Sequence, residues 1–151
     1  RCLGKGSSQI NPAMVPEKKQ KGYPMANQEQ LDLLRQGVAE WWNSWRQLHP
    51  DLLLDLDNAD LSEWNLGGFN LSQAHLRGAQ LTRADLNHAN LSAALFTNAN
   101  LSEVNLASAD VSDADFSGAT MYNAYLRDTN LNGARLTAEQ LEQADEGAFP
   151  F

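Results

Sequence analysis

The sequence has little of what disulfide-stabilised, membrane-spanning and metal-dependent proteins need. Its one cysteine, Cys2, excludes a disulfide within the chain. No apolar run approaches the roughly 20 residues that span a membrane as a helix. We therefore expect no membrane association and a cytoplasmic location. The three histidines, His49, His75 and His88, fall at unrelated positions of the chain and are not expected to share a metal ion.

Basic residues are also scarce once the first 24 residues are set aside. All four lysines lie in residues 1–24, where five basic residues face a single acid and give a charge of +4. Because the whole chain carries −8, the rest carries −12. We interpret residues 1–24 as a vector-derived leader before a natural start at Met25; a native basic arm is the alternative. The acidic remainder is not expected to bind nucleic acid, whose phosphates need basic residues.

What the chain has in abundance is a short repeat. From Leu56 to Leu141 an aliphatic or aromatic residue recurs at every fifth position, and an alanine stands two residues before most of them. Neither an α-helix, in which five residues advance about 500°, nor a flat strand with alternating side chains keeps such a series on one face. In a repeat such as residues 84–88, the first and third residues point inward if the last two turn the chain. A corner in every repeat bends the chain into stacked coils around a continuous core.

The repeats carry a recognisable motif, A(D/N)LXX. It occurs at Ala59-Asp60-Leu61, Ala84-Asp85-Leu86, Ala89-Asn90-Leu91, Ala99-Asn100-Leu101 and Ala109-Asp110-Val111. Over residues 54–138 the chain resembles the pentapeptide-repeat proteins. The resemblance implies an all-β solenoid, a right-handed quadrilateral β-helix of about four coils with four repeats in each. Residue n then lies over residue n+20, which stacks Phe96 on Phe116.

An amphipathic helix is predicted within residues 25–53, before the repeats. Asn27 and Gln30 fit its start, Gly37 interrupts it, and Pro50 follows its end. Its apolar residues are spaced by three or four positions: Leu31, Leu34, Val38, Trp41, Trp45 and Leu48. We expect it to cap the open end of the solenoid, and a coiled-coil or partner-binding helix is the alternative.

The first coil supports the capping hypothesis because it breaks the small-residue rule. Trp64 and Phe69 stand where alanine is expected, and we predict that they pack under Trp41 and Trp45. The segment from Gln36 through Arg46 also resembles the start of many cyanobacterial pentapeptide-repeat proteins.

A second cap is predicted in residues 139–151. Thr137 and Gln140 form a capping-box pattern, and a short helix to about Glu146 places Leu141 over the last coil. Gly147 ends this helix and leaves Phe149 and Phe151 in a tail that either folds back or meets a partner.

No catalytic constellation, metal site or cofactor motif is found in the sequence. Asp55, Asp57 and Asp60 superficially resemble a calcium loop, but Ala59 stands where a ligand is required and the glycine is missing. No serine or cysteine nucleophile lies near a histidine. We predict a protein that is not an enzyme and holds no cofactor.

Three surface residues remain as a candidate contact site. Leu95 and Tyr125 are predicted at outward positions and Tyr122 at a corner, where a polar residue is usual. Tyrosine is favoured at recognition surfaces, although scattered apolar surface residues are normal.

These observations favour a protein-interaction or structural scaffold module with an unknown protein partner, present as a monomer or weak dimer. The alternative, suggested by some pentapeptide-repeat proteins, is an acidic DNA mimic that acts on DNA gyrase. The shorter rod and the capped ends argue against the second hypothesis.

Overall fold

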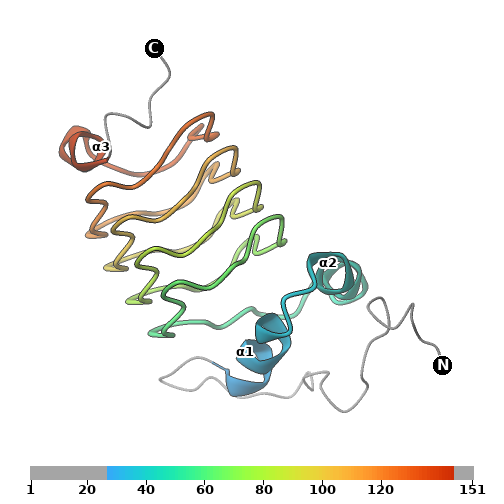
Figure 1. The fold of residues 1–151 in the computed structure, drawn as a ribbon. Coiled ribbons are helices and arrows are strands. Elements are labelled where there is room, and N and C mark those ends of the chain that lie inside the picture. The colour runs from blue at the N-terminus through green and yellow to red at the C-terminus, as the bar shows by residue number, and fades with distance from the viewer. Residues whose placement is uncertain (1–26, 145–151) are drawn as a thin grey trace.

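The structure, a computed structural model, describes residues 27–144 of the chain. It has three short helices, α1 (Gln28–Arg35), α2 (Ala39–Leu48) and α3 (Ala138–Gln143). Between α2 and α3 the chain winds as a stack of coils, with α1 and α2 at one end and α3 at the other (Figure 1). The sequence-predicted tail residues Gly147, Phe149 and Phe151 and the leader 1–24 lie outside the described residues.

The coils are joined by parallel β-bridges, each linking residue n to residue n+20, from Asp55–His75 to Asp115–Arg135. This register confirms the predicted 20-residue coil. A bridge occurs every five residues, so each coil has four sides. The first side carries Asp55, His75, Leu95, Asp115 and Arg135; the second Asp60, Gln80, Asn100 and Thr120; the third Asn65, Asp85, Asn105 and Tyr125; the fourth Asn70, Asn90, Asp110 and Asn130.

A tight turn closes every repeat. In the first, the Ala59 N–H donates to the Leu56 carbonyl at 3.1 Å, and Asn58 has a φ of 61°. A single positive φ at the third residue of the turn is the pattern of a type II turn. It recurs every five residues from Asn58 to Gly133, and twelve of these residues are not glycine.

The second residue of the motif, Asp or Asn, stabilises the same turn. Its side-chain oxygen accepts a hydrogen bond from the backbone N–H two residues later: the Ser72 N–H donates to Asn70 at 3.1 Å and the Ser112 N–H to Asp110 at 2.9 Å. This Asx-turn explains the (D/N) preference, because either side chain supplies the acceptor.

The axis of the rod is filled by the residues of the five-residue series. Leu86 and Leu106 are completely buried, and Ala84 and Val104, two positions earlier, are buried beside them. Phe96 and Phe116 stack as predicted, with ring centroids 4.8 Å apart and planes 3° apart. Interior positions within residues 56–126 are thus closed to a ligand, since side chains occupy them.

The segment before the repeats forms two helices, where the sequence indicated one interrupted helix. Gly37 has a φ of 74° and separates α1 from α2. The Asn27 side chain accepts from the Gln30 N–H at 3.2 Å, which confirms the predicted start.

The inward face of α2 differs from the prediction. Trp42, Trp45 and Arg46 are buried, whereas Leu48 is 71% exposed. The inclusion of Leu48 in the buried stripe was wrong. Leu48 lies seven residues after the buried Trp41 and so on nearly the same helix face, but it is the last residue of α2. Its exposure therefore follows from its place at the helix end and not from helical phase.

Polar side chains of the caps bond to the exposed strand edges of the end coils. At the N-terminal end, Gln30 accepts from the Asp55 N–H at 2.8 Å, and the Trp42 indole donates to the Asn70 carbonyl at 2.8 Å. At the C-terminal end the Gln140 amide donates to the carbonyls of Phe116 and Ala119 at 2.7 and 2.9 Å. These contacts satisfy backbone groups of the end coils that would bond to a further coil if the stack continued.

Candidate interaction surface

The groups most suited to chemistry are dispersed over the rod. The His49 ring stacks on Trp45 with centroids 4.8 Å apart, His75 lies on the first side, and His88 lies at a corner with a φ of 60°. Within residues 27–144 no three His, Cys, Asp or Glu residues are grouped closely enough to hold a metal ion. No helix in that range is both long and apolar enough to cross a bilayer.

The carboxylates of the repeats serve the turns. The Ser62 hydroxyl and backbone N–H lower the pKa of Asp60, and Ser112 and Ser117 lower the pKa of Asp110 and of Asp115 in the same way. Hydrogen bonds that favour the charged form have this effect. These carboxylates therefore remain ionised acceptors, and none has the raised pKa of a general acid.

The arginines of the repeat region all have acidic partners. Arg77 pairs with Asp57 at 2.9 Å, and Arg127 and Arg135 pair more loosely with Asp128 and Asp115 at 3.7 and 3.8 Å. These pairs leave the repeat region without a free basic patch for a phosphate backbone.

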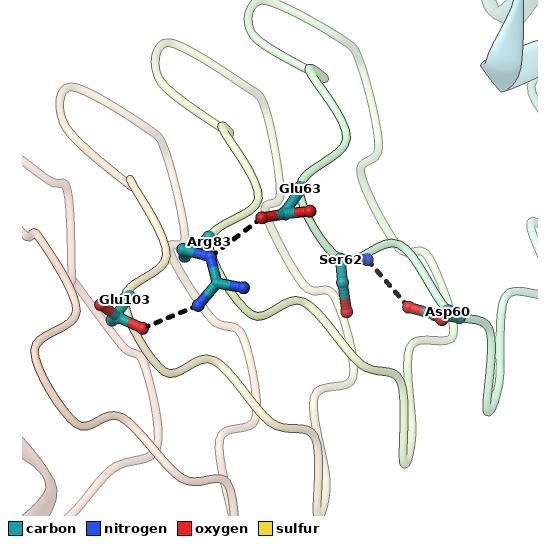
Figure 2. A network of polar contacts seen from close by, with 5 residues as sticks. All are labelled: Asp60, Ser62, Glu63, Arg83 and Glu103. Atoms are coloured by element: carbon teal, nitrogen blue, oxygen red, sulfur yellow. Dashed lines mark hydrogen bonds and ion pairs between the residues drawn. The ribbon is translucent and has the colours of Figure 1, made fainter.

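Arg83 lies at the centre of a ladder of charges along the corner between the second and third sides. It pairs with Glu63 of the coil before at 3.1 Å and Glu103 of the coil after at 3.2 Å, as Figure 2 shows. The hydrogen bond and charge of Glu63, followed by those of Glu103, raise the pKa of Arg83. Charge thus alternates along this corner in the 20-residue register.

Tyr122 stands at the same corner, one coil above Ser102. Its side chain is 57% exposed, in contrast to the buried aromatic residues of the core. It borders a hollow of about 660 Å³ between the last coil and α3. The hollow also includes Gly118, Thr120, Arg135, Leu136, Glu139 and Gln143.

The structure separates the three predicted contact residues into two groups. Tyr125 is half-buried on the third side, directly after the corner of Tyr122. Leu95 is half-buried on the first side. Since the first and third sides of a four-sided coil are opposite, Leu95 cannot share a surface with the tyrosines.

The predicted cap residues lie at the two ends of the rod. Trp41 and Trp45 are 4% and 1% exposed, and Leu141 is half-buried against the core. Phe69 is buried with its ring 6.3 Å from that of Trp42, whereas the Trp64 ring lies 5.0 Å from the Arg35 guanidinium.

The sequence reasoning placed Gln30 and Gln140 in the capping of their own helices but missed their bonds to the coils, and it missed Asn43 and Trp42. Their signal is weak because polar residues at a helix start suggest capping of that helix alone. The Trp41–Trp42 pair was a usable signal, since two adjacent large apolar residues widen the buried face of a helix.

A family profile described as "Pentapeptide repeats" matches residues 55–92 and 99–137, in eight copies. No curated protein matches the chain.

The chain is also similar in part to solved structures. The chain is 34% identical to a pentapeptide repeat protein from Nostoc Pcc 7120, with a TM-score of 0.43, and the match covers 62% of this chain and 73% of that one. For a pentapeptide repeat protein from the cyanobacterium Cyanothece 51142, identity is 31%, the TM-score is 0.31, and the shares are 56% and 61%. A third match is HetL, a pentapeptide repeat protein from Nostoc sp. strain PCC 7120 involved in heterocyst differentiation regulation. The identity is 24% and the TM-score is 0.29, and the match covers 60% of this chain and 58% of HetL. The chain thus spans less than two thirds of the latter two proteins.

Proposed function

The chain belongs to the pentapeptide-repeat family, and from that premise we propose that it is a non-enzymatic module that binds a protein partner. We further propose that its rod, residues 54–138, is the right-handed quadrilateral β-helix of that family, in about four coils. Residues 25–53 and 139–151 act as its caps in this proposal.

The observation that carries the interaction proposal is the exposure of Tyr122 beside a hollow at the C-terminal end. A tyrosine offers a large apolar ring and a hydroxyl, and such residues dominate the energy of many interfaces. The hollow of about 660 Å³ is large enough to receive side chains of a partner. Arg135 and Glu139 border it and supply one charge of each sign.

The absence of enzymatic activity is supported by the filled core and by the roles of the polar groups. Carboxylates accept turn hydrogen bonds, and the arginines of the repeats pair with acids. These groups already have structural partners. The DNA-mimic hypothesis gains no support from the comparisons.

A photo-crosslinking residue in place of Tyr122 tests the interaction proposal. We expect a discrete crosslinked protein from cell extract, and we expect Tyr122→Ser to lose the same protein in affinity purification. Gln73, exposed at the corner diagonally opposite, is the matched position for a control crosslinker. Equal crosslinking from both positions, or retention of the protein by Tyr122→Ser, would contradict the proposal.

Light scattering of the purified chain tests the expected oligomeric state. A mass of about 17 kDa corresponds to the monomer of 16.6 kDa. A weak dimer gives a mass that rises with concentration, because association follows mass action. A stable higher oligomer at low concentration would rule out both.

A further inference from the structure

The edge of the first coil that faces α1 and α2 is covered by these helices on only two of its four sides. On the first side the Asp55 N–H and carbonyl bond to Gln30 and Asn27, and on the fourth side those of Asn70 bond to Asn43 and Trp42. On the second and third sides the equivalent groups belong to Asp60 and Asn65. Within residues 27–144 the backbone N–H and carbonyl of these two residues make no hydrogen bond.

The second coil shows what this edge is able to bind. Six backbone groups on its second and third sides and their corners bond to the first coil at 2.7 to 3.0 Å. They are the N–H and carbonyl of Gln80, the carbonyl of Thr82, the N–H and carbonyl of Asp85, and the carbonyl of Asn87. The corresponding groups of the first coil lie between Asp60 and Gly67. An extended segment laid along this edge gains the same six bonds by strand addition.

A hollow of about 450 Å³ adjoins the third side at this edge. It is bordered by Leu34, Arg35, Gly37, Trp64 and Asn65. The Arg35 guanidinium lies 5.0 Å from the Trp64 ring centroid and holds one wall of the hollow. Its mixed walls, with Leu34 and Trp64 beside Arg35 and Asn65, give room for a side chain of an added segment.

The charges at the edge specify the chemistry of that segment. Glu63 is the first member of the corner ladder, and among residues 27–144 its ion pair is with Arg83 on its C-terminal side. Arg83, one coil further, has an acid on both sides. Asp60 and Glu63 lie on either side of Ser62 in the first coil, as Figure 2 shows. A basic residue in the same register before Glu63 continues the alternation and faces the Glu63 carboxylate, with the Asp60 carboxylate on the adjoining side.

We propose that the edge from Asp60 to Gly67 binds an extended basic segment of a partner protein as an added rung, with an arginine or lysine opposite Glu63. This edge lies at the opposite end of the rod from Tyr122, so the proposal is independent of the function proposed above.

The probe is a fluorescein-labelled peptide of residues 79–88 with its aspartate replaced by asparagine, AQLTRANLNH, so that the segment itself is basic and its arginine has the register that faces a glutamate in the rod. Anisotropy is measured against the full chain. We expect saturable binding, and binding about tenfold weaker when the arginine of the peptide is replaced by glutamate, since a charge-assisted contact becomes a repulsion.

Three variants locate the binding. Glu63→Lys reverses the preference between the two peptides, whereas Glu103→Lys, which removes the other partner of Arg83 away from the edge, leaves it unchanged. Asn65→Pro removes the edge N–H at a position where an edge strand tolerates proline, and we expect binding to be lost. Circular dichroism of each variant confirms that the fold persists.

Hydrogen exchange provides a second readout on the unaltered protein. The amides of Asp60 and Asn65 are expected to exchange more slowly with the arginine peptide, and Tyr122→Ser is expected to leave this protection unchanged. No binding at about 1 mM peptide, equal affinity for both peptides, binding retained by Asn65→Pro, or no protection at these amides would overturn the proposal. Binding that appears only after removal of residues 1–24 would also overturn it, since the chain itself would then occupy the edge.

Discussion

Replacing the glycine at the third position of a turn is expected to lower the free energy of unfolding most where an asparagine of the previous coil lies against that glycine. Gly78 and Gly68 both have positive φ, 66° and 76°, so alanine is strained at either position. A Cβ atom at Gly78 would overlap the Asn58 side-chain oxygen, whereas one at Gly68 would meet no atom within 4 Å. The two substitutions therefore differ mainly in this contact.

The magnitudes follow from these two effects. The left-handed conformation costs an alanine roughly 1–2 kcal/mol, and this applies to both variants. In Gly78→Ala the Asn58 side chain must also turn away and lose its present contacts, which costs about 1 kcal/mol more. We expect Gly78→Ala to lower the free energy of unfolding by about 2–3 kcal/mol and Gly68→Ala by about 1–2 kcal/mol.

Urea unfolding of a double-mutant cycle isolates the contact. Asn58→Gly removes the overlapping side chain, so the double variant Asn58→Gly/Gly78→Ala is expected to be more stable than additivity predicts by about 1 kcal/mol. The pair Asn58→Gly/Gly68→Ala should be additive, because the two positions share no contact. Equal losses for the two alanine variants, or no coupling in the first cycle, would refute the reasoning.

Two further predictions concern the cap and the turns. Gln140→Leu removes the bonds to the Phe116 and Ala119 carbonyls and is expected to cost about 2 kcal/mol in urea unfolding; the exposed Glu142→Gln serves as control, and a loss below that of the control would show that these bonds are dispensable. Carboxylates whose pKa is lowered by folding stabilise the native state above their unfolded pKa of about 4, and this stability is lost as the pH falls through the lower folded values. The melting temperature is therefore expected to fall as the pH is lowered below about 5. It should fall less in a triple Asp→Asn variant, because asparagine keeps the turn acceptor without titrating. An identical dependence of melting temperature on pH for both proteins would contradict this assignment. The three positions are Asp60, Asp110 and Asp115.

The rod could be predicted closely from the sequence because its structure is periodic. One repeat such as residues 84–88 determines which side chains point inward, and the phase does not change through the coils that follow. The Phe96–Phe116 stack followed from the register alone. The caps repeat nothing, so their prediction depended on helical phase. A single left-handed residue, Gly37, breaks the helix and resets the phase that the Leu31–Leu48 spacing assumed.

The candidate surfaces could be predicted only in part, for a related reason. A tyrosine at a corner is visible in the sequence, and Tyr122 is exposed as expected of a corner residue. The edge at Asp60 and Asn65, which α1 and α2 leave uncovered, is not visible in the sequence, because it depends on where these helices bond to the first coil. Nothing in the repeat itself distinguishes these residues from Asp55 and Asn70, whose backbone groups the helices bond.

The turns of the repeats explain the oxygen acceptors on the surface of the rod but not their negative charge. The fold requires an oxygen acceptor at the second position of each repeat, and asparagine supplies it at Asn70 and Asn90 as aspartate does at Asp60 and Asp110. An aspartate there adds a charge that the turn does not need and that repels other acids of the rod. Where an arginine pairs with the acid, as with Arg135 and Asp115, the added charge has a structural use. At Asp60, as at Asp85 and Asp110, no ion pair forms within residues 27–144. What distinguishes Asp60 is its place in the first coil, where its charge is available to the basic segment proposed above.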